Sequence, residues 1–180
     1  MTKKLRIILP IAILTLILGV AGWHFFIQTY HFSIVQPDVL YRDGLQGMRR
    51  FRNAYRWHPF KTVINLQSEE NVGGKYKQQF DEEQQFCAEN HIRFFRIPIL
   101  DKTAPTPKQI AEFLKIASDP ANQPVLMHDS QGVVREGMLV AVWQIEKMGY
   151  SNERCLKEAL FLDHAKGDVL ETFIREYKKR

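Results

Sequence analysis

The hydrophobic and polar positions divide the chain into one long apolar stretch and a series of short apolar runs. Residues 7–27 contain no formally charged side chain. A helix of that length, at about 1.5 Å per residue, crosses a hydrocarbon core of about 30 Å. The pattern therefore predicts a transmembrane helix over residues 7–27, within an N-terminal anchor over residues 1–30.

The basic residues around this stretch predict an orientation. Lys3, Lys4 and Arg6 precede it, and the next Lys or Arg is Arg42. The positive-inside rule then places the N-terminus in the cytoplasm and the rest of a single-pass membrane protein outside. A cleaved signal peptide is the alternative, because small residues at 19–21 follow a plausible apolar region.

Beyond residue 30, short apolar runs alternate with longer amphipathic ones. The predicted strands cover 33–41 (a strand, or a hairpin turning at Pro37 and Asp38), 61–66, 92–99 and 124–128. The predicted helices cover 44–57, 75–89, 107–117, 135–148, 151–162 and 168–177, with Thr106 as an N-cap. Strands that alternate with helices predict an α/β fold for residues 31–180, with a parallel-type central sheet and helices on both faces.

The helix predicted over residues 135–148 is apolar on nearly every side. Met138, Leu139, Val142 and Trp143 would face different directions on it, so we expect it at the centre of the domain. A strand and a glycine-containing turn precede it. Backbone N–H groups and the helix dipole converge at such a helix N-terminus, which predicts an anion site there.

Composition removes several classes of protein. The 180 residues are 45% hydrophobic and 12% aromatic, which excludes disorder. Two cysteines, Cys87 and Cys155, exclude a disulfide scaffold, and they could be paired or free. The net charge is +5, of which Lys3, Lys4 and Arg6 supply +3, so the remaining +2 argues against nucleic-acid binding. No set of residues has metal-ligand spacing, and we expect neither a metal nor a cofactor.

The loop over residues 128–137 reads His-Asp-Ser-Gln-Gly-Val-Val-Arg-Glu-Gly. It resembles the signature loop H-C-x-x-G-x-x-R-[ST]-G of the protein-tyrosine phosphatase superfamily, dual-specificity branch. His128, Gly132, Arg135 and Gly137 match that pattern. Segments 39–44, 61–66 and 121–128 resemble small atypical plant- and fungal-type members, and the resemblance spans roughly residues 37–165.

The resemblance implies roles for these residues. In the family, a Cys thiolate attacks phosphorus while the Arg and the loop N–H groups bind the phosphoryl oxygens. That assigns phosphate binding to the loop residues Ser130, Gln131, Gly132, Val133, Val134 and Arg135. His128 and Glu136 would orient the loop. Asp101, 28 positions before Asp129, is the candidate general acid, although a turn aspartate is an equal alternative.

The chain departs from the family pattern at two positions. Asp129 stands where the nucleophilic Cys is expected, and Glu136 replaces the Ser or Thr whose hydroxyl helps the phospho-enzyme break down. Cys87, which begins a second C-x5-R sequence, has no glycine turn and precedes a strand, so we interpret it as a packing residue. We therefore predict a pseudophosphatase that binds a phosphorylated protein, a small phosphoester or a protein partner.

Two alternative functions remain open. The chain could be an active phosphoester hydrolase, but an aspartyl nucleophile at Asp129 would need Mg²⁺ and a nearby second carboxylate, and Gln131 stands where one is expected. A rhodanese-like module also carries an anion loop before a helix, and fits less well. Asp129 could also occupy its own loop, bound to Arg135 and the loop amides, and so compete with phosphate.

Overall fold

The computed structural model describes residues 3–28, 31–45, 47–163 and 169–179. The chain divides into two compact units, residues 1–30 and residues 31–180, and each is described by itself. The first unit is the helix α1, Lys3–Gln28, which contains Pro10. The second unit carries the sheet, the remaining helices and the candidate site.

The membrane prediction for the first unit is wrong. In the part of the chain that the structure describes, no helix has both the length and the hydropathy needed to cross a membrane. This finding contradicts the predicted transmembrane helix over residues 7–27, the membrane as a partner and the single-pass localisation.

The second unit contains one five-stranded sheet in the order β1-β2-β5-β3-β4. The strands are β1 Ser33–Gln36, β2 Leu40–Gly44, β3 Thr62–Asn65, β4 Arg93–Arg96 and β5 Val125–Asp129. β2, β5, β3 and β4 are parallel, whereas β1 is antiparallel to β2. The prediction of a parallel-type sheet is therefore wrong at this edge. The turn after β1 is too short for a crossover, which confirms the hairpin alternative for residues 33–41.

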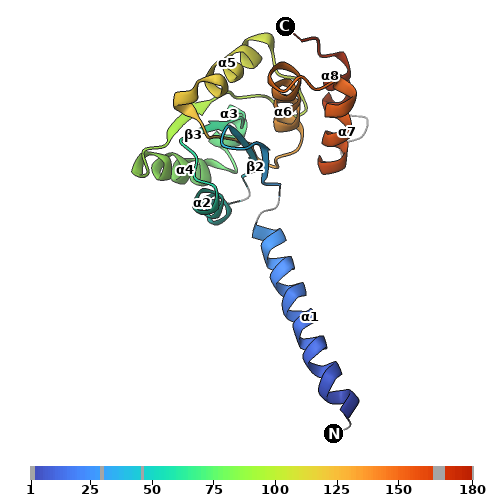
Figure 1. Ribbon diagram of the computed structural model, residues 1–180. Helices are drawn as coiled ribbons and strands as arrows, with labels where there is room; N and C mark the ends of the chain where they lie inside the picture. The colour runs from blue at the N-terminus through green and yellow to red at the C-terminus, as the bar shows by residue number, and fades with distance from the viewer. Residues whose placement is uncertain (1–2, 29–30, 46, 164–168, 180) are drawn as a thin grey trace. The chain divides into compact units, whose positions relative to one another are not determined.

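Seven helices follow in the described residues, and helices lie on both faces of this mixed sheet (Figure 1). They are α2 Met48–Trp57, α3 Glu69–Gly73, α4 Lys77–Glu89, α5 Pro107–Ser118, α6 Val134–Lys147, α7 Asn152–Asp163 and α8 Val169–Glu176, with a short 3-10 turn over Pro120–Asn122. The predicted capping of α5 is confirmed, because the Thr106 hydroxyl accepts from the Gln109 N–H. The short helix α3 was not predicted.

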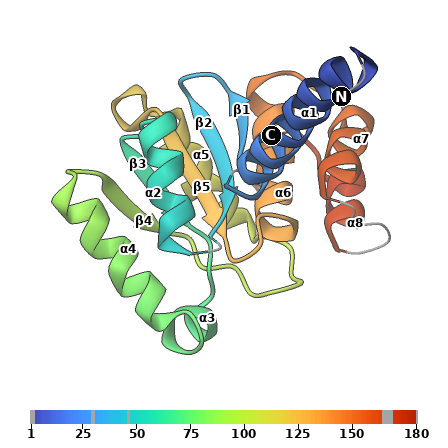
Figure 2. The ribbon, with the colours of Figure 1, turned by 90° about the horizontal axis from the view of Figure 1, so that it is seen from below.

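Alternate residues of the strands separate two cores. Leu126 packs toward α2 and α4, whereas its neighbours Val125 and Met127 pack toward α5 and α6. Figure 2 shows α2 against one face of the strands and α5 behind the other. This period-two pattern is what a sheet covered on both faces requires.

Helix α6 belongs to two cores at once. Leu139 and Trp143 pack against the sheet and α5, whereas Met138 and Ile145 pack against α7 and α8. Every residue from Arg135 to Ile145 is buried. The prediction of a central helix is confirmed, and its N-terminus holds the last residues of the candidate loop in a fixed place.

Candidate active site

The candidate loop lies where β5 ends and α6 begins, at the carboxyl edge of the central strand. The backbone of the flanking segments continues the sheet to this point. Leu66 donates its N–H to the His128 carbonyl, and Leu45 donates to the Asp129 carbonyl, both at 2.9 Å. Because parallel strands end at one edge, loops that follow β2, β3 and β5 meet here.

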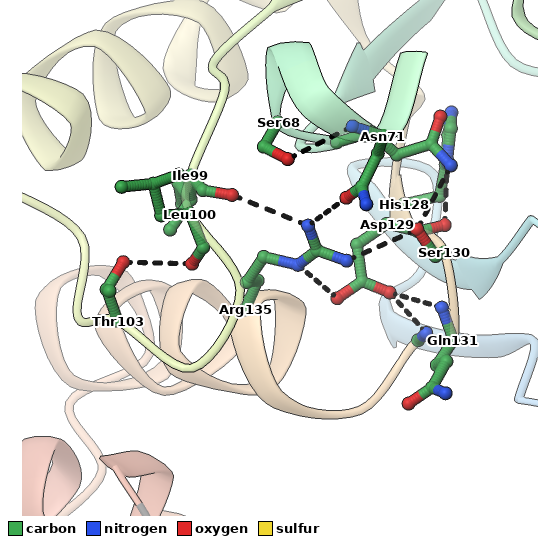
Figure 3. A network of polar contacts seen from close by, with 12 residues as sticks. Ser68, Asn71, Ile99, Leu100, Thr103, His128, Asp129, Ser130, Gln131 and Arg135 are labelled. Atoms are coloured by element: carbon green, nitrogen blue, oxygen red, sulfur yellow. Dashed lines mark hydrogen bonds and ion pairs between the residues drawn. The ribbon is translucent and has the colours of Figure 1, made fainter. Parts of the chain in front are cut away.

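The Asp129 carboxylate is bound by its own loop. Its Oδ1 atom accepts hydrogen bonds from the Gln131 N–H at 2.7 Å and the Gly132 N–H at 2.5 Å. Its Oδ2 atom accepts from Nε of Arg135 at 3.1 Å (Figure 3). The side chain is 3% exposed. The hypothesis that Asp129 occupies its own loop is confirmed as geometry.

The Arg135 guanidinium uses its other nitrogens on neighbouring segments. Nη1 donates to Oδ1 of Asn71 at 2.9 Å and to the carbonyl of Ile99 at 3.4 Å, and Nη2 donates to the Ser130 hydroxyl at 3.3 Å. Figure 3 shows these groups converging from α3, the 99–101 segment and the loop. The donors that a bound oxyanion would use are therefore largely engaged within the protein.

A chain of polar side chains supports Ser130 from β3. The Gln67 amide donates to the Ser130 hydroxyl at 3.1 Å. Gln67 is in turn held by Asn65, whose Oδ1 accepts the Gln67 N–H at 2.8 Å. Asn65 also donates to Glu83 at 3.0 Å. Gln67, Asn65 and Glu83 are all buried, so this network fixes the loop from beneath.

His128 and Glu83 form a fully buried pair under the loop. Nε2 of His128 lies 2.5 Å from Oε1 of Glu83, and both side chains are 0% exposed. Burial lowers the pKa of His128, but the charge and hydrogen bond of Glu83, with smaller contributions from Asp129 and Asp43, raise it overall. The contact between the His128 ring and Glu83 fits the predicted loop-orienting role, and that role stays a prediction.

Asp43 is a second buried carboxyl beside this pair. It is opposite His128 in the β2–β5 register. Burial raises the pKa of Asp43 to about 7, although His128, the Gly44 N–H, Arg50 and Arg42 each lower it. Asp43, which lies beside the residue that begins the loop, therefore has a pKa near neutral pH.

Strand β2 also meets the loop through Arg42 and Gly44. Nη2 of Arg42 donates to the Gly132 carbonyl at 2.6 Å, and Nε donates to Oε1 of Glu136 at 3.0 Å. A Cβ atom at Gly44 would lie 2.4 Å from the Gln131 carbonyl oxygen, so only glycine permits this approach. Glu136 thus faces Arg42 rather than the Arg135 guanidinium.

A small cleft of about 110 Å³ opens onto the loop. Asp101, Asp129, Ser130 and Arg135 line it, and its other lining residues are Asn71, Tyr76, Gln131 and Val134. Asp101 is exposed. The structure therefore brings the candidate acid to the same cleft as the loop, whereas His128 and Glu136 lie beneath it and Val133 forms the N-cap of α6.

Sequence reasoning missed the residues that reach the loop from elsewhere. Gln67 and Asn71 follow β3, and Arg42 lies on β2. The available signal was topological: polar residues after parallel strands gather at one edge of the sheet. Among the described residues, no group of three or more His, Cys, Asp or Glu side chains is placed to hold a metal ion.

The second C-x5-R sequence forms no site. Cys87 lies on α4 and is 1% exposed, and both Cys87 and Cys155 are free thiols. Burial raises the pKa of Cys87 to about 12 and that of Cys155 to about 11. Neither thiol is reactive near neutral pH, so the interpretation of Cys87 as a packing residue is confirmed.

Solved structures of similar fold are phosphatases. The core catalytic domain of the PP-IP phosphatase SIW14 from S. cerevisiae is 23% identical, with a TM-score of 0.68, over 82% of this chain and 85% of that one. TpbA from P. aeruginosa is 19% identical, with a TM-score of 0.60, over 82% of this chain and 85% of that one. At these identities the likeness shows the fold.

The curated relatives are much longer proteins. A probable NAD kinase 2, chloroplastic, from Oryza sativa subsp. japonica is 28% identical over 122 residues, which cover 63% of this chain and 12% of that protein. NAD kinase 2, chloroplastic, from Arabidopsis thaliana is 29% identical over 85 residues, or 47% of this chain and 8% of that protein. The chain thus spans about a tenth of these relatives.

The family match covers most of the chain and includes the entire loop. Residues 46–176 match the family described as "DSP-PTPase phosphatase fused to NAD+ Kinase". The predicted resemblance to dual-specificity phosphatases is confirmed by this match and by the phosphatase fold. The chain belongs to this family of dual-specificity phosphatase domains.

Proposed function

We propose that this chain is a pseudophosphatase, a binding protein on a phosphatase fold that does not turn over phosphoesters. The observation that carries the proposal is the position of the Asp129 carboxylate, which accepts the N–H groups of Gln131 and Gly132 and the Nε–H of Arg135. In the family pattern, a Cys stands at this position, and a bound phosphoryl group accepts the hydrogen bonds from the loop N–H groups and the Arg. Asp129 has no thiolate to attack phosphorus, and its carboxylate accepts the hydrogen bonds that a phosphoryl group would otherwise accept.

The same contacts favour a protein partner over a phosphorylated ligand. A phosphoryl group would have to displace the Asp129 carboxylate from two loop N–H groups and from Arg135. It would also bring like charge beside a buried carboxylate, which is unfavourable at low dielectric. We therefore infer that the native loop does not hold phosphate, which leaves a protein partner as the ligand class that the proposal retains.

An active hydrolase is the second candidate, and one observation favours it. Asp101 lines the same cleft of about 110 Å³ as Arg135 and Ser130. A carboxyl group there could protonate a leaving-group oxygen, as the resemblance implies for a general acid. Turnover by the native chain would require Asp129 to leave Arg135 and attack phosphorus itself.

Hydrolysis of an aryl phosphate by the full chain tests the proposal. We expect no turnover by the native chain above that of Arg135→Ala. We expect Asp129→Cys to gain turnover, because a thiolate would replace the carboxylate that occupies the donors. In that background, Arg135→Ala should abolish the gain, and Asp101→Asn should lower it by about 10².

The controls separate the two candidate functions. Turnover by the native chain that Arg135→Ala removes would overturn the pseudophosphatase proposal. If the native chain is silent and Asp129→Cys is active, the loop and the acid are intact and the Cys-to-Asp replacement alone prevents catalysis. Asp119→Asn, at an exposed aspartate that caps a distant 3-10 turn, is the matched control for Asp101→Asn.

A further inference from the structure

The carbonyl groups of the loop face β2, and its N–H groups face the other way. The Gly132 carbonyl accepts from Nη2 of Arg42 at 2.6 Å. The Gln131 carbonyl is bound by the His31 ring, and its oxygen would lie 2.4 Å from a Cβ atom built on Gly44 of β2. Because a trans peptide group is planar, its C=O and N–H point in opposite directions. The N–H groups of residues 132 and 133 are therefore directed away from β2.

The Gly132 N–H shows which group lies on the side of the loop away from β2. The Gly132 N–H, which shares a peptide group with the Gln131 carbonyl, donates to the Asp129 carboxylate at 2.5 Å. The next peptide group has its carbonyl on Arg42. Gly132 has a φ of 72°, a left-handed conformation that glycine adopts without strain. The turn of the loop at this point thus depends on what holds the Gly132 carbonyl.

Arg42 is itself held in one orientation. Its Nε donates to Oε1 of Glu136 at 3.0 Å, and the two side chains are 4% and 0% exposed. A guanidinium group is a rigid planar fork, so fixing Nε also fixes the direction in which Nη2 donates. Glu136 lies in the first turn of α6. The ion pair therefore joins β2, the loop and the helix that follows.

We propose that Arg42 is a positioning residue of the loop, held by Glu136: by binding the Gly132 carbonyl it turns the Val133 N–H toward the anion side of the loop. The anion in the native chain is the Asp129 carboxylate. Arg42 acts through the Gly132 peptide and contacts no ligand itself. This assigns Glu136, at the position of the family's Ser or Thr, the role of fixing Arg42.

Amide signals of the native chain test this role without any activity measurement. We expect Arg42→Gln to shift the Gly132 and Val133 amide signals strongly and to speed hydrogen exchange at Gly132 at least about ten-fold relative to the β5 amides. Glu136→Gln keeps an acceptor for Arg42 and should have a smaller effect in the same direction. Arg56→Gln, at an exposed arginine of α2, controls for loss of charge.

Phosphate binding gives a second measurement, and this arm rests on the proposed function. Asp129→Ala should free the loop donors, and inorganic phosphate should then shift the Gly132 and Val133 amide signals. Adding Arg42→Gln should weaken that phosphate affinity about ten-fold, or about 1.4 kcal/mol. If Asp129→Ala binds no phosphate, the proposal that Asp129 takes the place of phosphate in the loop is contradicted. The amide signals of the native chain still decide the role of Arg42.

A purely structural ion pair predicts a different result. Arg42→Gln would then lower the melting temperature but leave the Gly132 and Val133 amides and the phosphate affinity within two-fold of the parent, which would overturn the proposal. If Arg42→Gln does not fold, Arg42→Lys decides. A lysine supplies one ammonium group rather than a fork, so it should shift the same amides partially. Unchanged signals in Arg42→Lys would also overturn the proposal.

Discussion

At the scale of single residues, Asp43 gives the fold a pH dependence near neutrality. Burial raises its pKa to about 7. A carboxyl whose pKa is raised by folding stabilises the native state while it is protonated. That contribution is complete below its unfolded pKa of about 4 and is lost as the pH rises through its folded pKa. We expect the free energy of unfolding to fall by about 2–3 kcal/mol between pH 5 and pH 8.

Urea unfolding at several pH values checks this expectation. Asp43→Asn keeps a neutral side chain at every pH, so it should lack most of the fall that the native chain shows. Asp81→Asn, at an exposed aspartate of α4, should keep it. The raised pKa of His128 acts in the same direction and should leave a residual slope. An Asp43→Asn slope equal to that of the native chain would contradict the expectation.

The residues of the loop could be predicted from the sequence, but their supports could not. The contact of Asp129 with Arg135 and the loop amides was one of the hypotheses that the sequence raised, because a carboxylate is itself an oxyanion. Arg42, Gln67 and Asn71 reach the loop from 63 to 90 positions away. Their contacts depend on the order of strands in the sheet, and no local spacing in the sequence records that order.

At the scale of elements, the end of β2 and the loop form one packed unit through Gly44. A Cβ atom there would lie 2.4 Å from the Gln131 carbonyl oxygen and 3.0 Å from the Gly132 nitrogen. Both are backbone atoms, so the clash cannot be relieved by a side chain that rotates. We expect Gly44→Ala to destabilise the fold by about 1–3 kcal/mol and to shift the Gln131 and Gly132 amide signals.

A second glycine provides the matched control. A Cβ atom at Gly73, in α3, would have nothing within 4 Å. Gly73→Ala should therefore be neutral or stabilise the fold by up to about 1 kcal/mol. Chemical denaturation with amide spectra measures both variants. Equal effects of the two substitutions would mean that the close approach of Gly44 to the loop does not make an added Cβ atom destabilising.

The elements beyond residue 30 follow closely from hydrophobic period and capping. The structure has α5 from Pro107 and α4 to Glu89, as the sequence predicts. The helix predicted from residue 44 begins only at Met48, because Gly44 ends β2. The other exceptions are short or depend on pairing. Helix α3 has five residues and one buried side chain, Val72, so its apolar period is too brief to detect. The antiparallel direction of β1 depends on a hairpin turn, which the alternation of apolar residues does not specify.

At the scale of the whole molecule, the apolar stretch at the N-terminus shows the limit of a charge count. An absence of charge over residues 7–27 predicted a membrane span, whereas no helix in the described residues meets the length and hydropathy of one. The alternation of strands and helices in residues 31–180 was a stronger signal. It combines many short segments that must agree with one layered architecture.

The same architecture makes α6 the helix on which both of its neighbouring cores depend. Leu139 is buried among the sheet and α5, and Met138 among α7 and α8, each at 0% exposure. We expect Leu139→Ala and Met138→Ala each to lower the free energy of unfolding by about 2–5 kcal/mol, because each leaves a cavity in a packed core.

Hydrogen exchange tests whether these two cores unfold together. If α6 couples them, Leu139→Ala should lower protection in α8 as well as in β5, and Met138→Ala should lower protection in β5 as well as in α8. Leu100→Ala, at a side chain that is 61% exposed, should change stability by less than about 0.5 kcal/mol. If each substitution lowers protection in only one core, the two cores unfold independently. Loss in both would mean that the loop at the start of α6 keeps its geometry only while the whole second unit is folded.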